Sequence, residues 1–515
     1  MQAAKRIALN TGVLYGRMGI TIFISLYSTR LTLDALGVKD FGLFNVVGGI
    51  ILMLGFLNAS MAAATQRFMS FAQGKGDLDN LKKIFKVSLL LHIIISVLLL
   101  ALLELAGYIL FNGVLNIVPE RIEAAKVVYQ FMVVSTLFTV ISVPYDAVIN
   151  ARENMLLFAV LGIIEAVLKL LIAIYISTAT GDRLIIYGLL TAVLAIFLLI
   201  IRVIYCQLKY KECSIGIRAN YEPKLMKEMT GFAGWSLMGS STSMIAGYGQ
   251  GTVMNIFFGT AVNAAQGIAS QISGQLGAFS TTMLRALNPT IAKSEGAGER
   301  GRMVQAAMIG SKVSFFLLML FVLPAMVEMP VILKLWLKEV PPFAVIFCQL
   351  LLIRNLVEQL FLTLVTSIAA VGKIRKFQVT SSILTVFPLL ITYWLYSLGY
   401  PAYTIYVVFI IYSIVTAFNV LYYSNRLFDM SYSLYFKEVI IRCSLSFIVT
   451  LLVALIPHSL MDEGLTRLLM VGASSSLAFL YAVWAIGLSK NERLACKGVA
   501  LTSLKKFRGN KFSLE

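Results

Sequence analysis

Charged residues are scarce in this chain of 515 residues. They make up 13% of the composition, whereas hydrophobic residues make up 59%, and the mean hydropathy is +0.86. So little charge beside so much apolar surface excludes a water-soluble globular protein. The apolar runs are long enough for helices that cross a bilayer, which needs about 20 residues each. The sequence therefore predicts an all-α polytopic membrane protein.

Cysteine and histidine are also rare, with five and two residues respectively. The cysteines are scattered without metal-ligand spacing, so neither a metal site nor a disulfide framework is expected. The sequence has no Gly-x-x-x-x-Gly-Lys-Ser/Thr loop and no soluble domain that could house one, which excludes a nucleotide-driven machine. We therefore expect no cofactor and no enzymatic activity.

Apolar runs of membrane length number about fourteen, beginning with residues 9–33 and 42–70 and including 229–257 and 262–291. The net charge is +18, but the lysines and arginines lie mostly in every second link between runs. That alternation is typical of membrane topology rather than of a nucleic-acid-binding surface. By the positive-inside rule it predicts a multi-pass protein of the cell inner (plasma) membrane with both termini cytoplasmic.

An internal repeat appears when the chain is shifted, without a gap, so that Gly12 falls on Gly234. The same shift superposes Gly37 on Gly259, Gly55 on Gly277, Met61 on Met283, Ala64 on Ala286, Gly74 on Gly296 and Gly76 on Gly298. Six spans separate the copies, so both insert the same way up, and a pseudo-two-fold axis along the membrane normal would relate two six-helix lobes. The predicted division is an N-terminal lobe (1–208), a cytoplasmic linker helix (209–228), a C-terminal lobe (229–426), two additional transmembrane helices (427–488) and a basic cytoplasmic tail (489–515).

Four short motifs open the chain in a fixed order. They are Gly16-Arg17, Ser28-Thr29-Arg30-Leu31, Leu36-Gly37-Val38-Lys39-Asp40-Phe41-Gly42-Leu43-Phe44 and Gln66-Arg67-Phe68. This opening resembles the Wzx-type polysaccharide flippases of the multidrug, oligosaccharidyl-lipid and polysaccharide exporter superfamily. The resemblance implies a V-shaped pair of helical bundles that moves an undecaprenyl-diphosphate-linked oligosaccharide to the periplasmic leaflet for lipopolysaccharide or capsule synthesis. It also implies polysaccharide polymerase machinery as a partner.

Charged residues inside the predicted spans are the candidate functional residues, because an arginine at a helix centre costs about 2.5–3.5 kcal/mol on insertion scales. Glu165 with Lys169 and Arg354 with Glu358 lie four residues apart within single spans. Each pair either neutralises itself within its helix or supplies charge to a cavity. The same two interpretations apply to Arg30, because Asp34 follows it by four residues.

Arg17 and Arg285 differ, because neither has an acidic residue within four positions of the sequence. If both guanidinium groups face a central cleft, the cleft is positive and suited to a diphosphate, whose oxygens match the guanidinium fork. The alternative is snorkelling of each side chain toward the cytoplasmic headgroups. The resemblance supports the first interpretation, since arginines of the first and eighth spans contribute to a cationic cavity in related flippases.

Two other functions stay open at this point. A multidrug or cation antiporter on the same scaffold would place unpaired acidic residues in its cavity, whereas this chain places arginines there. A membrane glycan polymerase or ligase would need a large outer loop, and every predicted outer link is short. The sequence therefore favours a flippase that works by alternating access, with Arg17 and Arg285 holding the diphosphate.

Overall fold

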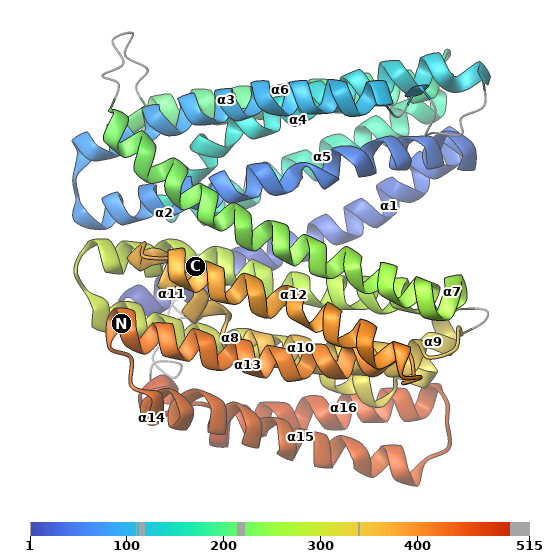
Figure 1. The fold of residues 1–515 in the computed structure, drawn as a ribbon, viewed down its shortest axis with the longest axis vertical. Helices are drawn as coiled ribbons and strands as arrows, with labels where there is room; N and C mark the ends of the chain where they lie inside the picture. Colours follow the sequence, from blue (N-terminus) through green and yellow to red (C-terminus); the bar gives the residue numbers. More distant parts are fainter. Residues whose placement is uncertain (1, 110, 113–118, 214–221, 338–339, 495–515) are drawn as a thin grey trace, which may run out of the picture. The chain divides into compact units, whose positions relative to one another are not determined.

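The computed structural model describes residues 2–109, 111–112, 119–213, 222–337 and 340–494. Every regular element in these ranges is a helix, as Figure 1 shows. The prediction of an all-α polytopic membrane protein is confirmed. The chain divides into two compact units, which we describe separately. The N-terminal unit comprises Gly12–Ser241 and Ala292–Glu299, and the C-terminal unit comprises Met1–Thr11, Thr242–Ile291 and Arg300–Glu515.

The first half of the chain forms long helices joined by short connections. They are α1 (Gln2–Met53), α2 (Gly55–Lys75), α3 (Leu78–Ile109), η2 (Pro119–Arg121), α4 (Ile122–Ala151), α5 (Met155–Thr178), α6 (Arg183–Lys209), η3 (Lys211–Cys213) and α7 (Pro223–Gly296). Pro223 opens α7, as its fixed φ angle allows at a first helical position. Of the predicted linker 209–228, residues 214–221 lie outside the described chain.

The second half contains more helices, several of them short. They are α8 (Arg300–Val327), α9 (Met329–Trp336), α10 (Ala344–Gln359), α11 (Leu362–Val371), α12 (Arg375–Ser397), α13 (Thr404–Phe428), α14 (Tyr432–Tyr435), η4 (Phe436–Ile440), α15 (Ile441–Leu460), α16 (Leu465–Ala482) and η5 (Val483–Gly487). All of them belong to the C-terminal unit. Within it α15 and α16 pack side by side.

Two helices are each interrupted by one glycine with non-helical backbone angles. Gly37 in α1 has φ 73° and ψ 165°, and Gly259 in α7 has φ 75° and ψ −171°. A residue with a β-carbon rarely adopts a positive φ, so only glycine reverses the backbone there without strain. These two glycines are superposed by the sequence shift described above. Gly76 and Gly298, with φ 71° and 76°, show the same correspondence. The repeat read from the sequence therefore has matching backbone conformations.

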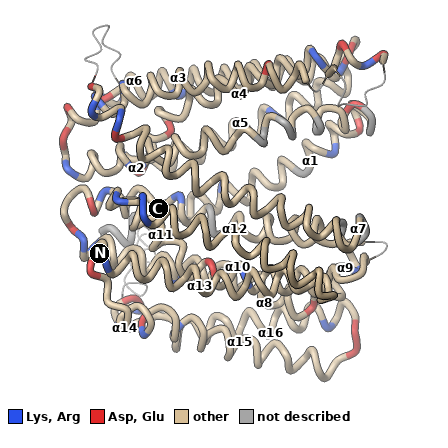
Figure 2. The backbone as a smooth tube through the Cα atoms, in the orientation of Figure 1, with Lys and Arg blue, Asp and Glu red and all other residues tan. Residues whose placement is uncertain are grey.

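The helices support the predicted number of spans in part. Among the described residues, nine helices are long and apolar enough to cross a membrane, and α10 with α11, bent by 41°, would make a tenth. The other four predicted spans fall on the kinked helices α1 and α7 and on α2. Figure 2 shows that charged residues gather near helix ends, whereas helix middles are mostly uncharged. That distribution is expected where the middles face hydrocarbon.

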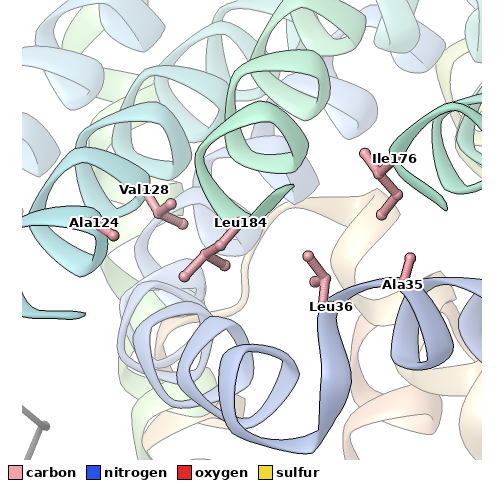
Figure 3. Packing of buried hydrophobic residues seen from close by; sticks show 6 residues of the cluster. All are labelled: Ala35, Leu36, Ala124, Val128, Ile176 and Leu184. Carbon is pink, nitrogen blue, oxygen red and sulfur yellow. The ribbon is translucent and has the colours of Figure 1, made fainter. Parts of the chain in front are cut away.

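A buried apolar cluster holds the kink of α1 against three other helices of the N-terminal unit. Its members are Ala35, Leu36, Ala124, Val128, Ile176 and Leu184, drawn in Figure 3. Ala35 and Leu36 come from α1 just before Gly37, and the others come from α4, α5 and α6. The cluster fixes α1 beside α5.

Candidate functional site

Arg17 lies across α5 in the N-terminal unit. Its guanidinium carbon is 4.7 Å from the centre of the Phe158 ring. One turn further along α5, a β-carbon added to Gly162 would come within 2.1 Å of Arg17 Nε. The guanidinium therefore packs over an aromatic ring and against a helix surface that is open only because residue 162 is glycine. Such a stacked cation contributes about 0.5–1 kcal/mol at exposed sites and more when desolvated.

The start of α5 explains why Phe158 and Gly162 stand where they do. Asn154 is the N-cap of α5, and its side-chain oxygen accepts a hydrogen bond from Leu157 N at 3.2 Å. The Asn154 amide also donates to the hydroxyls of Tyr205 and Tyr210. A capped helix start is well defined, because the cap satisfies a backbone N–H that would otherwise lack a partner. Phe158 and Gly162 follow within the first two turns.

Glu165 and Lys169 form an ion pair further along α5. Lys169 Nζ donates to Glu165 Oε1 at 2.7 Å. The two helices meet here as well, since the Ser28 hydroxyl of α1 donates to the backbone oxygen of Lys169 at 3.3 Å. The helix-local ion pair is therefore present, and a role for its charges in a cavity stays a prediction.

Arg30 and Asp34 do not form the ion pair that their spacing favours. Both side chains are exposed, and within the described chain neither takes part in a salt bridge. The helix is regular through both residues, so the separation arises from the side-chain directions and not from the backbone. Exposed pairs at this spacing contribute only about 0.3–0.5 kcal/mol, so the spacing alone does not require the pair to form.

Arg354 and Glu358 form a helix-local ion pair in the C-terminal unit. Arg354 Nε donates to Glu358 Oε1 at 2.7 Å, and the guanidinium carbon lies 4.8 Å from the centre of the Phe409 ring. The Ser413 hydroxyl donates to the same carboxylate oxygen at 3.1 Å. The pair is therefore built into the packing of α10 against α13.

Arg285 is an exposed residue of α7 in the C-terminal unit. Arg17 belongs to the N-terminal unit. Each arginine is described within its own unit, so the prediction that both face one cavity stays a prediction. Among the described residues, no group of three or more His, Cys, Asp or Glu could hold a metal ion.

The environment of Arg67 is one that the sequence reading missed. The guanidinium carbon lies 4.6 Å, 5.0 Å and 5.5 Å from the ring centres of Phe68, Phe71 and Phe232. Glu228 and Glu295 interact with it electrostatically. Phe68 and Phe71, at positions i+1 and i+4, were the available signal, whereas Phe232 and Glu295 are distant in the sequence.

A shallow, open depression of about 300 Å³ lies on one face of α7. It is lined by Gly231, Gly234, Trp235 and Met238. These positions lie three, four and seven residues apart and share one helix face. The lining residues belong to the predicted span 229–257.

Two ion pairs of the C-terminal unit lie where the chain leaves α15 and α16. Lys334 donates to Glu463 at 2.7 Å, and this hydrogen bond holds the pKa of Glu463 below its ordinary value. Burial acts to raise the pKa of Glu492, but hydrogen bonds from Lys312 and Ser489 outweigh it, so that pKa is also lowered. Both carboxylates therefore act as charged anchors for connecting segments.

The chain resembles solved transporter structures over most of its length. One is the outward-facing conformation of a multidrug resistance MATE family transporter of the MOP superfamily, with 14% identity, a TM-score of 0.69, and coverage of 82% of this chain and 95% of that one. A MATE structure in complex with MaL6 gives 15% identity, a TM-score of 0.68, and coverage of 82% and 96%.

Another solved structure is a MOP superfamily transporter from Pyrococcus furiosus. It gives 15% identity, a TM-score of 0.66, and coverage of 84% of this chain and 96% of that one. That protein is described as having a binding pocket of reverse polarity that suggests a different function. None of the curated proteins compared with the chain matches it.

In sequence, the family model MatE matches residues 18–175. That stretch runs from α1 into α5 and lies within the N-terminal unit. Identities of 14–15% carry the fold but not the activity of the solved proteins. The chain therefore has the fold of the MATE transporters, and its residues 18–175 carry the sequence pattern of the MatE family.

Proposed function

We propose that this chain is a membrane transporter that works by alternating access. The observation that carries the proposal is the likeness to the outward-facing multidrug resistance MATE transporter, which covers 82% of this chain. The glycine interruptions of α1 and α7 add support, since broken helices with repeat-related positions are typical of transporters of this kind. The cargo has two candidates, each favoured by a different observation.

The first candidate cargo is an undecaprenyl-diphosphate-linked oligosaccharide, moved from the cytoplasmic to the periplasmic leaflet. The pairing of the acidic residues supports it. Three acidic residues each form an ion pair with a basic residue: Glu165 with Lys169, Glu358 with Arg354, and Asp146 with Arg202. A carboxylate that is already neutralised is poorly placed to bind a cationic drug. The opening motifs also favour this cargo. In this hypothesis Arg17 and Arg285 bind the diphosphate, and polysaccharide polymerase machinery is a partner.

The second candidate is a multidrug or cation antiporter. The comparisons favour it more directly, because a multidrug resistance protein is among the solved structures with this fold, and the sequence match is to the MatE family. The transporter from Pyrococcus furiosus supports neither candidate alone, since its pocket is described as reversed in polarity. The choice of cargo therefore needs a direct assay.

A transport assay in proteoliposomes separates the two candidates. The first predicts movement of undecaprenyl-diphosphate-linked oligosaccharide between leaflets and no proton-driven export of ethidium. The second predicts ethidium export and no lipid movement. In cells that lack the gene, the first also predicts lipid-linked repeat units on the cytoplasmic leaflet. If neither cargo moves in either assay, the proposal of a transporter with these cargo classes is contradicted.

The substitution Arg17→Ala tests the role of the cationic site. A charge-assisted hydrogen bond contributes about 1.5–3 kcal/mol, so loss of the guanidinium should weaken diphosphate binding about ten- to hundredfold while the protein still inserts. Lys437→Ala is the matched control, because it removes one positive charge from an exposed position outside the site. Normal surface polysaccharide in cells with Arg17→Ala would contradict a diphosphate-binding role.

A further inference from the structure

The contact between Arg17 and α5 is more specific than a chance surface contact. Phe158 and Gly162 are one turn apart on the same face of α5, since residues at i and i+4 neighbour each other on a helix. The guanidinium carbon of Arg17 lies over the first and its Nε, Cζ and Nη2 atoms lie closest to the second. Together they form a contact surface for Arg17, which we call the seat. It consists of the ring face of Phe158 and of the gap left by the missing side chain of Gly162, which we call the notch.

The notch exists because residue 162 has no side chain. A β-carbon there would come within 2.1 Å of Nε, and within 2.4 Å of both Cζ and Nη2. Carbon and nitrogen atoms do not approach so closely without a bond, so any larger residue displaces the guanidinium. These atoms belong to the mobile end of a long side chain, which can move without moving the backbone. The consequence of filling the notch is therefore local.

A guanidinium binds a diphosphate through parallel N–H···O bonds whose directions are fixed by its plane. The orientation of that plane therefore decides where the phosphate oxygens must lie. A side chain with several rotatable bonds has no fixed plane unless its surroundings supply one. In this chain the ring of Phe158 and the notch at Gly162 form part of these surroundings.

We infer that Phe158 and Gly162 are positioning residues that set the plane of the Arg17 guanidinium for an anionic cargo headgroup. This inference rests on the anionic form of the proposed function. It adds that the site is built by α5 as well as by α1. A larger residue at 162 or a non-aromatic one at 158 would then impair recognition of the headgroup although Arg17 itself is unchanged.

Binding in nanodiscs tests the inference, with undecaprenyl diphosphate as the probe and undecaprenol, which lacks phosphate, as its reference. Gly162→Ala should reduce the preference for the diphosphate about tenfold or more, because a misplacement of about 1 Å can cost up to about a hundredfold. Gly16→Ala is the matched control, because it adds the same methyl group next to Arg17 in the chain, where nothing beyond the neighbouring residues and the backbone of its own helix lies within 4 Å. Equal preference in Gly162→Ala and Gly16→Ala would overturn the inference.

Phe158 provides a second test that does not depend on the notch. Phe158→Tyr retains the ring face and should retain the preference for the diphosphate, whereas Phe158→Leu should lose it. A purely structural role would instead lower the affinities for undecaprenyl diphosphate and undecaprenol alike. Equal behaviour of the tyrosine and leucine variants would contradict a positioning role for the ring.

A measurement without cargo separates the seat from the proposed function. Melting temperatures of Arg17→Met, Phe158→Leu and the double variant form a cycle that isolates their interaction. The double variant should lose less than the sum of the single losses, and strict additivity would contradict the seat. If the wild-type protein binds undecaprenyl diphosphate no better than undecaprenol while the cycle shows coupling, the anionic cargo is wrong and the seat stands.

Discussion

At the scale of single residues, Glu328 shows how this chain keeps a charge in its interior. The carboxylate is fully buried between α8 and α9. Arg467 donates to one of its oxygens at 3.0 Å, and His458 Nδ1 lies 2.8 Å from the other. Both partners come from α15 and α16, so one residue ties these helices to the rest of the C-terminal unit. Removing a partner leaves a buried charge without compensation, which is costly.

The substitution Arg467→Met should therefore destabilise the protein by about 3 kcal/mol or more. Lys334→Met is the control, because Lys334 and Glu463 form an ion pair with side chains that are 65% and 43% exposed. Exposed pairs contribute about 0–1 kcal/mol. Thermal unfolding in detergent would measure the difference, and equal melting temperatures for the two variants would show that Glu328 does not need Arg467.

At the scale of helices, the ends of α2 and α7 cross with their backbones in contact, within the N-terminal unit. A β-carbon on Gly74 would lie 2.0 Å from the carbonyl oxygen of Lys293, and one on Gly296 would lie 2.0 Å from that of Phe71. The shift that superposes Gly74 on Gly296 also superposes Phe71 on Lys293. The repeat seen in the sequence thus reappears as a reciprocal contact. Only glycine at both positions permits so close an approach.

Gly74→Ala should consequently force the two helix ends apart, at a cost of about 1–3 kcal/mol for overpacking. Gly277→Ala is the matched control, since this glycine is also helical and has no atom within 4 Å of an added β-carbon. It should leave stability unchanged or raise it slightly, because alanine favours a helix. A Gly74→Ala protein as stable as the control would mean that the crossing opens without cost.

At the scale of the whole molecule, the basic links between the spans predict the orientation in the membrane. Residues such as Lys82, Lys209 and Lys376 lie in links that the positive-inside rule assigns to the cytoplasm. With an even number of spans, the same rule predicts both termini on that side. The helix bounds agree with about fourteen spans only if α1 and α7 each contribute two segments that meet at Gly37 and Gly259.

Cysteine labelling of intact cells checks this arrangement, in a background where the native cysteines are replaced. A cysteine at Asp462, in the connection between α15 and α16, should react with a membrane-impermeant maleimide. A cysteine at Lys82 should react only after the membrane is permeabilised. Labelling of both positions in intact cells, or of neither, would contradict the predicted topology.

The candidate site was predictable in its charges but not in its surroundings. Arg17, Glu165 and Lys169 could be selected from the sequence because charge inside an apolar run is costly and therefore conspicuous. The ion pair of Glu165 and Lys169 followed from a spacing of four residues. Phe158 and Gly162 gave no such signal, because an aromatic residue and a glycine are ordinary in an apolar helix. Their contact with Arg17 arises only because α1 packs against α5 in the folded chain.

The amino-acid sequence by itself determined the membrane class, the helical fold and the internal repeat, since hydropathy, helix length and the special freedom of glycine act locally along the chain. Tertiary structure alone decided that Arg67 lies beside the ring of Phe232, that Glu328 binds Arg467, and that Arg17 packs over Phe158. Each of these contacts joins residues that are far apart in the sequence. Their energy depends on distance and burial, which no local pattern encodes.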